Sequence, residues 1–183
     1  CGYGGSCFPK DVKAIIGMAK DVGFSPILMQ AVEDRNQSQK HRLVERIVES
    51  YSDDLSGLIF GVWGLAFKPG TDDVREASST VIIRELVERG ATVKAYDPAA
   101  MKTILHEIDS DWIGTKLVLC DHQYAAVNNA DALILVTEWN LFRQPDFSTM
   151  ERVMKSKTIF DGRNQYDPRR LREQGWEYVG VGR

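Results

Sequence analysis

The sequence is poor in the residues that bind metals or cross-link small folds. It contains three cysteines and three histidines in 183 residues, and the histidines, at positions 41, 106 and 122, show no metal-ligand spacing. An odd number of cysteines without the spacing of a disulfide framework is typical of a reducing compartment. We therefore expect no metal site, no disulfide-rich scaffold and a cytoplasmic location.

Long hydrophobic runs and an excess of positive charge are absent as well. No apolar stretch approaches the about 18 residues that a membrane-spanning helix requires. The net charge is −3 and the pI is about 5.7, whereas proteins that bind nucleic acids or anionic membranes carry clustered basic charge. The sequence thus argues against both partners, while its 43% hydrophobic residues suffice for a packed core.

The apolar pattern predicts two helices followed by alternating strands and helices. Residues 9–22 form one predicted helix that Gly23 ends, and a second helix, with Ser25 as N-cap and Pro26 at its first position, runs to about residue 50. The expected strands are 58–64, 92–96, 117–119, 132–136, 158–160 and 177–179, and the later helices are 79–89, from about 99, and 124–128. Strands and helices in this alternation predict an α/β fold, in which an N-terminal helical segment precedes a Rossmann-like, doubly wound parallel sheet.

The middle of the second predicted helix is polar. Residues 33–42 form a ten-residue polar stretch between two apolar faces. Such a stretch is typical of a solvated helix surface. The alternative is a helix whose centre faces a polar site or a partner subunit.

Cys7 lies in a setting that favours reactivity. The segment GGSCFPKD, residues 4–11, combines two glycines that permit a tight turn with a proline that opens the first predicted helix. A thiol just before a helix N-terminus, with Lys10 close by, favours the nucleophilic thiolate. The alternative is a small buried cysteine at a helix start.

The loop after the first predicted strand carries a second candidate site. Gly61-x-x-Gly64 is followed by FKPG at residues 67–70, which falls short of a full Gly-x-Gly-x-x-Gly fingerprint. Alone, it indicates a generic nucleotide or phosphate loop, or simply a turn. Residues 71–79 are expected to cap the next helix, with Ser78 as N-cap. Asp97 lies about 33 residues after Gly64 rather than the usual ~20, so we interpret it as structural.

Three segments together resemble the UDP-glucose/GDP-mannose dehydrogenase family. Residues 2–13 (GYGGSCFPKDVK) resemble its catalytic-cysteine segment, residues 61–79 the start of its C-terminal nucleotide-sugar domain, and residues 160–164 (FDGRN) its late arginine motif. The resemblance spans essentially the whole chain, in family order. It implies a central helical region over residues 1–55, whose long helix links the domains and packs in a dimer, and a Rossmann-like UDP-binding domain over residues 56–183.

The resemblance also implies roles for ten residues. Cys7 and Asp11 would be catalytic, Tyr3, Gly4, Phe8, Phe67, Lys68 and Arg163 would bind the sugar nucleotide, and Lys10 and Arg75 would face the cofactor NAD. An aromatic face can stack on a ring, a lysine can neutralise a phosphate, and an arginine fork suits a pyrophosphate.

The implied reaction oxidises a primary alcohol of a sugar nucleotide to an acid in two NAD-dependent steps, through a cysteine thiohemiacetal and thioester. Within the family, the motifs favour UDP-glucose, which would give UDP-glucuronate. GDP-mannose and UDP-N-acetyl sugars remain alternatives, as does a non-catalytic nucleotide-binding module with a structural or redox-sensing Cys7. The family's NAD-binding domain precedes the segment that this chain resembles, so we expect a C-terminal portion of a homodimeric enzyme, inactive alone.

Overall fold

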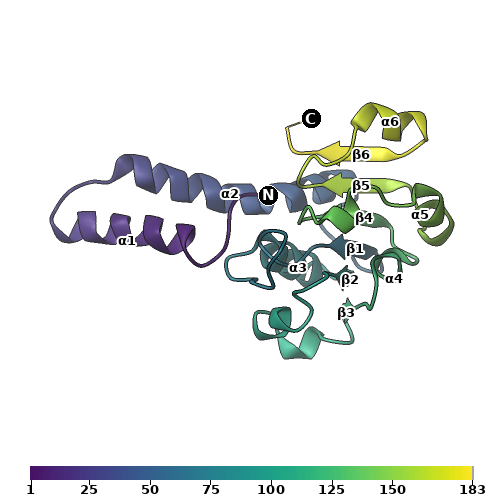
Figure 1. The fold of residues 1–183 in the computed structure, drawn as a ribbon, viewed down its shortest axis with the longest axis horizontal. Helices are drawn as coiled ribbons and strands as arrows, with labels where there is room; N and C mark the ends of the chain where they lie inside the picture. Colours follow the sequence, from purple (N-terminus) through teal and green to yellow (C-terminus); the bar gives the residue numbers. More distant parts are fainter. Residues whose placement is uncertain (183) are drawn as a thin grey trace.

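One parallel sheet forms the centre of the fold. The computed structural model describes residues 1–182, and its six strands follow the order β3-β2-β1-β4-β5-β6 (Figure 1). Every neighbouring pair is parallel. The strands are β1 (Ile59–Trp63), β2 (Thr92–Tyr96), β3 (Leu117–Leu119), β4 (Ala132–Leu135), β5 (Thr158–Asp161) and β6 (Glu177–Gly180). The predicted doubly wound parallel sheet is confirmed, and the strand order reverses between β1 and β4, where such folds place their ligands.

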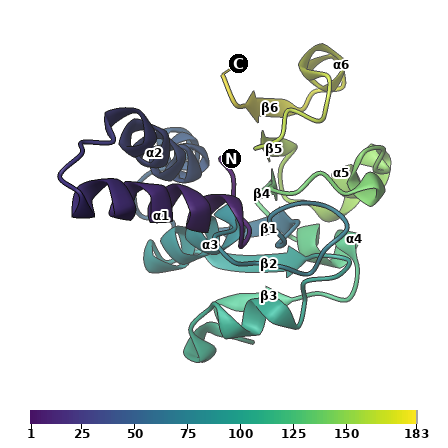
Figure 2. The ribbon, with the colours of Figure 1, turned by 60° about the vertical axis from the view of Figure 1, so that its left-hand side comes forward.

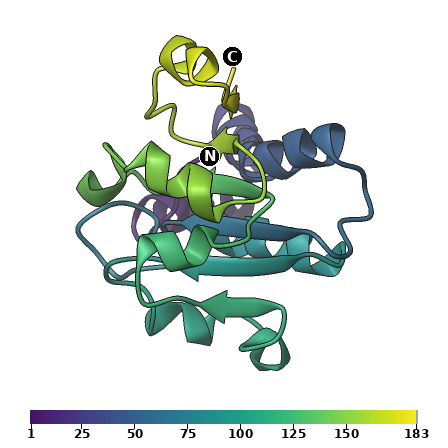
Figure 3. The ribbon, with the colours of Figure 1, turned by 90° about the vertical axis from the view of Figure 1, so that its right-hand side faces the viewer.

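Helices cover both faces of this sheet. They are α1 (Phe8–Asp21), α2 (Ile27–Ser50), α3 (Ser78–Glu88), α4 (Gln123–Val127), α5 (Phe147–Val153) and α6 (Pro168–Glu173), with 3-10 turns η1 (Thr103–His106), η2 (Ser110–Trp112) and η3 (Asn140–Phe142). In Figure 3, α4 and α5 lie in front of the strands, and α2 and α3 lie behind them. The strands are therefore buried on both sides, which explains their continuous apolar sequences.

Two hydrophobic clusters fill the space between the sheet and the helices. Val62 and Ile134 belong to the cluster beneath α2 and α3, whereas Trp63 and Leu135 belong to the cluster beneath α4 and α5. Successive side chains of a strand point to opposite faces, so each strand supplies both clusters. This packing fixes the positions of the strand ends. It therefore also positions the loops that follow the strands and carry the candidate site.

The first two helices form an antiparallel pair that extends beyond the sheet (Figures 1 and 2). The second half of α2 is anchored, because Leu43, Val44 and Ile47 lie in the same cluster as Phe60 and Val62. The tip of the pair carries exposed apolar side chains, namely Met18, Val22, Phe24, Ile27 and Leu28. Among residues 1–182, no helix combines the length and apolar composition needed to cross a bilayer.

The helix predicted from about residue 99 is wrong. In its place, the N–H groups of Ala99 and Ala100 donate to the Asp97 carboxylate at 2.8 and 2.9 Å, and only the turns η1 and η2 follow. These bonds are those of a helix N-cap, but the segment after Asp97 continues only into short 3-10 turns. After Asp167, whose carboxylate accepts from the Arg169 N–H in the same way, the helix α6 does follow.

Two predicted N-caps are also wrong. The helix α2 begins at Ile27 with Pro26 as its N-cap, so Ser25 lies outside it. The helix α3 has Ala77 as N-cap, and the Ser78 hydroxyl donates instead to the carbonyl oxygen of Cys1. The Ser78 hydroxyl therefore makes a tertiary hydrogen bond and not the local N-cap bond that the sequence predicts.

Candidate functional site

Cys7 lies at the end of a short loop that leads into α1. It is the N-cap residue of that helix, and its carbonyl accepts a hydrogen bond from the Asp11 N–H at 2.9 Å. The cysteine is exposed, at the helix end where unpaired N–H groups concentrate positive potential. The predicted position before a helix N-terminus is confirmed, and the alternative of a buried cysteine is wrong.

The glycines before Cys7 let its loop approach the loop after β1. Gly5 has a φ of +90°, and a Cβ atom there would lie 2.8 Å from the ring of Phe67. Its N–H donates to the carbonyl of Arg75 at 2.8 Å. A side chain on Gly4 would collide with the main chain of Glu76. Close backbone approach therefore requires both glycines and brings the cysteine loop onto the Phe67 segment.

Phe67 and Lys68 form one unit on the rim of the sheet. The Lys68 ammonium lies 5.2 Å from the centre of the Phe67 ring, within the range of a cation–π contact. The main chain of Phe67 is fixed by its N–H, which donates to the Asp73 carbonyl at 3.0 Å. An aromatic face and a cation are thus presented together beside the cysteine loop.

Arg163, which follows β5, connects three loops at the carboxyl end of the sheet. Its guanidinium donates to the Val136 carbonyl at 2.7 Å and to the Phe67 carbonyl at 3.3 Å, and it lies 3.1 Å from the Glu138 carboxylate. The side chain is partly buried between the ends of β1 and β4. It therefore lies next to the main chain of Phe67.

Arg75 extends over the same rim. Its guanidinium binds Asp73 at 2.9 and 2.8 Å, which raises the pKa of Arg75 and lowers that of Asp73. The main chain of Arg75 contacts the cysteine loop, because its carbonyl accepts from the Gly5 N–H. A hollow of about 390 Å³ beside Arg75 is lined by Lys40, Glu76 and Arg84 among others.

Tyr3 and Phe8 flank the cysteine loop. Their rings meet edge to face, with centroids 4.6 Å apart. The Tyr3 hydroxyl donates to Glu33 at 3.4 Å, and burial, together with the charge of Glu33, raises the pKa of Tyr3. These two aromatic side chains line the side of the loop that faces α2.

Lys10 and Asp11 lie in the first turn of α1. They form an exposed ion pair with 3.2 Å between the ammonium and the carboxylate. Exposed pairs of this kind hold their partners weakly. Both side chains are therefore near Cys7 and available to other groups, but neither contacts the Phe67 segment in the way that Gly5 does.

The loop after β1 does not offer its first N–H groups to a ligand. Asp97 is 1% exposed, and its carboxylate accepts from the N–H groups of Leu65 at 2.7 Å and Ala66 at 3.1 Å and from the Trp139 indole at 3.0 Å. In Rossmann folds this loop cradles a dinucleotide pyrophosphate. Here the N–H groups of the loop are bound to the carboxylate of Asp97 instead. This agrees with the interpretation of Asp97 as a structural residue.

Sequence reasoning missed three residues that hold the site together. Glu33, Asn36 and Lys40 are buried on one face of α2, so one face of the predicted polar centre faces a polar site, while residues 34, 35, 38, 41 and 42 are exposed to solvent. Lys40 and Asn36 reach Glu76 and Tyr3 respectively. The spacing of three and four residues was a visible signal in the sequence, whereas nothing local pointed to Glu76.

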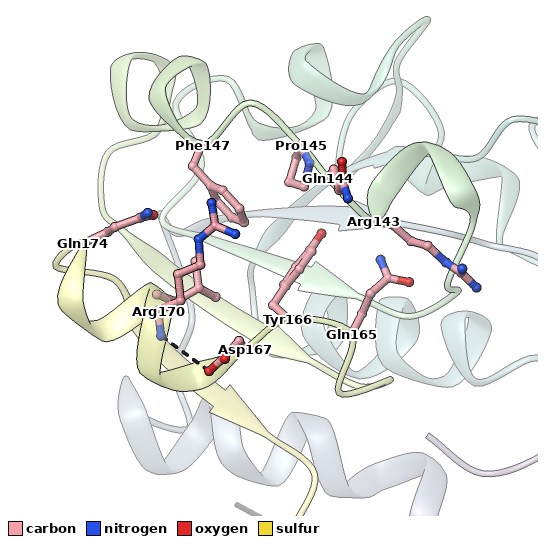
Figure 4. Close-up of a pocket in the computed structure, with 10 residues that line it drawn as sticks. Arg143, Gln144, Pro145, Phe147, Gln165, Tyr166, Asp167, Arg170 and Gln174 are labelled. Carbon is pink, nitrogen blue, oxygen red and sulfur yellow. Dashed lines mark hydrogen bonds between the residues drawn. The ribbon is translucent and has the colours of Figure 1, made fainter.

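A separate hollow of about 370 Å³ lies between the segments around α5 and α6 (Figure 4). In Figure 4, Arg143 and Arg170 stand on opposite sides of Tyr166, whose hydroxyl donates to the Phe142 carbonyl at 2.6 Å. No residue with a predicted role lines this hollow. Within residues 1–182, no group of histidine, cysteine and carboxylate side chains could hold a metal ion.

Comparison with known proteins matches this arrangement to one family. Residues 61–168 match the sequence profile of the UDP-glucose/GDP-mannose dehydrogenase family, UDP binding domain. Residues 1–38 match the profile of the central domain of the same family. The first match covers more than half of the chain and includes the Phe67, Arg75 and Arg163 segments.

Comparison with whole proteins indicates the same family. The chain is 47% identical over 183 residues to a UDP-glucose 6-dehydrogenase of Pseudomonas aeruginosa, covering 100% of this chain and 40% of that protein. It is 34% identical to a UDP-glucose 6-dehydrogenase of Rhizobium meliloti, again covering 100% of this chain and 40% of the relative. A solved UDP-glucose dehydrogenase from Pyrobaculum islandicum superposes with a TM-score of 0.79 at 31% identity, covering 98% of this chain and 38% of that one. The chain thus spans about two fifths of the length of these relatives.

Proposed function

Since the chain belongs to the UDP-glucose/GDP-mannose dehydrogenase family, we propose that it is the C-terminal portion of an NAD-dependent UDP-glucose 6-dehydrogenase. The observation that carries the proposal is the exposed thiol of Cys7 at the start of α1, in a loop that packs on Phe67 and donates the Gly5 N–H to the Arg75 carbonyl. The names of the relatives favour UDP-glucose over other sugar nucleotides. We assign residues 1–55 to a central helical domain and residues 56–183 to a UDP-binding domain.

Cys7 is the nucleophile of the proposed reaction. After the sugar alcohol has been oxidised to an aldehyde, the thiolate attacks the carbonyl carbon, a C–S bond forms, and the oxygen takes a proton to give a thiohemiacetal. Loss of hydride from that carbon and of the proton from its hydroxyl leaves a thioester. Water then adds, the C–S bond breaks, and the carboxylic acid and the Cys7 thiol are released. Asp11, one turn into α1, is the carboxylate closest in sequence for positioning that water or moving its proton.

The remaining site residues bind the substrate in this proposal. Phe67 offers an aromatic face and Lys68 a cation to the sugar and its diphosphate, and Tyr3 and Phe8 border the opposite side of the loop. Arg163, on the loop after β5, is available to bind the nucleotide. Gly4 contributes its main chain to the loop that borders the sugar, while the Glu76 main chain fills the space where a side chain of Gly4 would lie.

NAD fits this chain only in part. The amides that a Rossmann loop would offer its pyrophosphate are bound to Asp97, so the main binding domain for NAD belongs outside this chain. Arg75 and Lys10 are exposed cations on the same side as Cys7 and would contact its phosphates. When bound, NAD accepts the hydride in each oxidation.

Two partners follow from the same proposal. The exposed apolar tip of the α1–α2 pair would be covered in a homodimer, and the exposed surface around Cys7 would face an N-terminal NAD-binding domain of the same protein. The three free cysteines agree with the reducing conditions of the cytoplasm. The chain alone is expected to produce no NADH, and turnover by it would contradict the proposal.

The decisive experiment counts NADH per UDP-glucose in a protein that joins this chain to an NAD-binding domain. We expect two NADH per sugar, lost or stalled in Cys7→Ser and unchanged in the matched variant Cys120→Ser, since Cys120 follows β3 at another place in the sheet. If NADH is produced with GDP-mannose or a UDP-N-acetyl sugar and not with UDP-glucose, the substrate is that sugar nucleotide and not UDP-glucose. Binding of a sugar nucleotide without NADH from any of them would favour a non-catalytic nucleotide-binding module.

A further inference from the structure

The main chain before Cys7 is held by polar groups from two directions. The Asn36 side chain on α2 accepts from the Tyr3 N–H at 2.8 Å and donates to the Tyr3 carbonyl at 3.2 Å. From the other direction, the Arg75 carbonyl accepts from the Gly5 N–H at 2.8 Å. Residues 3–5 are therefore fixed between a helix and the loop after β1, two residues before the thiol.

Glu76 joins the three elements that meet here. Its carboxylate accepts from the Lys40 ammonium on α2 at 2.9 Å and from the Lys13 ammonium on α1 at 2.5 Å. Lys40 is 2% exposed, although lysine is almost never fully buried unless it is paired. The pair formed by buried Lys40 and exposed Glu76 thus connects the middle of α2 to the loop that receives Gly5.

The backbone of Glu76 needs such support. Its φ is +53°, in the left-handed region that residues other than glycine adopt rarely and at a cost. Its main chain also contacts Gly4, where a Cβ atom would lie 2.9 Å from the Glu76 carbonyl carbon. The turn at Glu76 sets the position of the neighbouring Arg75 carbonyl, and so of the bond to Gly5.

We propose that Asn36, Lys40 and Glu76 are positioning residues for Cys7. They fix residues 3–5 against the loop after β1, and this placement sets the distance of the thiol from Phe67 and Arg75. The three residues act through the main chain and not on the thiol itself. The inference rests on the proposed function only in taking Cys7 as the reacting group.

Lys40→Met tests the proposal, because methionine fills the same buried space, and the Glu76 carboxylate is 37% exposed and keeps its ion pair with Lys13. We expect hydrogen exchange of the Gly5 amide to become at least about tenfold faster, since a local opening governs it. We also expect the rate of Cys7 alkylation by iodoacetamide at a fixed pH to change at least about twofold, because residues 3–5 no longer hold the thiol in one place against the loop after β1.

Two comparisons separate positioning from general stability. Arg42→Met removes a cation from an exposed pair on the same helix and should change neither readout. In a Glu76→Gln background, Lys40→Met should add less than about a twofold change, since the two residues act as one unit. Lys40→Gln, a polar replacement, gives the same two readouts if the methionine variant does not fold.

The proposal is overturned if folded Lys40→Met, or Lys40→Gln, keeps the exchange rate of Gly5 and the alkylation rate of Cys7. It is also overturned if Gly5 and a sheet amide such as that of Val62 accelerate equally, because Lys40 would then act only on global stability. Neither readout requires a sugar nucleotide or NAD. If the protein that joins this chain to an NAD-binding domain produces no NADH, the proposed function is contradicted, but the positioning role is not.

Discussion

At the scale of single residues, the site depends on residues whose conformation is fixed by contacts with their neighbours. The Asp97 carboxylate accepts from N–H groups on the loops after β1 and β2 and from the Trp139 indole. Gly5 combines a left-handed backbone with ring contact to Phe67. Both residues are fixed by contacts that form only in the folded chain, so each is open to a direct test by substitution.

Asp97→Ala is expected to lower the free energy of unfolding by about 3 kcal/mol or more, because several buried donors lose their charged acceptor. Urea denaturation followed by circular dichroism measures the change. Asp121→Ala removes a carboxylate that is 90% exposed and should stay within about 0.5 kcal/mol of the unchanged protein. Equal effects of the two substitutions would show that Asp97 is not the structural anchor described above.

Gly5→Ala is expected to destabilise the protein by roughly 1–3 kcal/mol, since alanine must adopt a positive φ against the Phe67 ring. Gly17→Ala is the matched control, because a Cβ there meets nothing within 4 Å. In the middle of α1 it should stabilise the protein by roughly 0.5–1 kcal/mol. Thermal unfolding of both variants checks the pair, and a neutral Gly5→Ala would mean that the loop can retreat from Phe67.

At the scale of elements, the sequence predicted the strands and missed features made by tertiary contacts. All six strands were predictable because each is a short apolar run between turn residues, as in the buried β4. The helix expected after Asp97 does not form, although the Asp97 carboxylate accepts from the Ala99 and Ala100 N–H groups as an N-cap would, and only 3-10 turns follow. The Cys7 helix start was predictable from Pro9, whereas the pairing of Glu76 with two lysines required knowledge of which elements meet.

The junction of α1, α2 and the loop at Glu76 predicts a pH dependence of stability. Hydrogen bonds from Lys13 and Lys40 hold the pKa of Glu76 below its ordinary value. A depressed pKa stabilises the fold above the unfolded value of about 4.3, and this contribution is lost as the pH falls through the folded pKa. The difference in unfolding free energy between the unchanged protein and Glu76→Gln should therefore be full at pH 7 and shrink below about pH 4.

Urea titrations at several pH values measure that difference. Glu45→Gln, which removes an exposed carboxylate paired with Arg42, supplies the comparison and should show no such trend. A gap between the unchanged protein and Glu76→Gln that stays constant from pH 7 to pH 3 would contradict the linkage.

At the scale of the whole molecule, the chain is a sheet domain with an arm. The second half of α2 is anchored in the sheet's core, while the tip of the α1–α2 pair stands away from it (Figure 2). Phe24, Ile27 and Leu28 are each at least two thirds exposed there, at 67%, 76% and 76%. Adjacent exposed apolar residues on one surface are typical of an interaction site.

Ile27→Asp is expected to weaken self-association of the chain at least about tenfold, because it places a charge in the surface that we propose for the homodimer. Sedimentation equilibrium over a range of concentrations measures the effect. Leu141→Asp, at an apolar side chain that is 48% exposed in η3, is the matched control and should leave association unchanged. A chain that is monomeric at every concentration would contradict the proposed use of this surface.

The Asp97 carboxylate has a consequence for how a charged ligand approaches the sheet. It places a fixed negative charge at the point where the strand order reverses, the position that dinucleotide folds keep electropositive. Under the proposed function, a diphosphate would be repelled from that point and attracted to the cations of Lys68, Lys10 and Arg75. The internal carboxylate would then direct the proposed ligand toward the edge of the sheet where Cys7 lies.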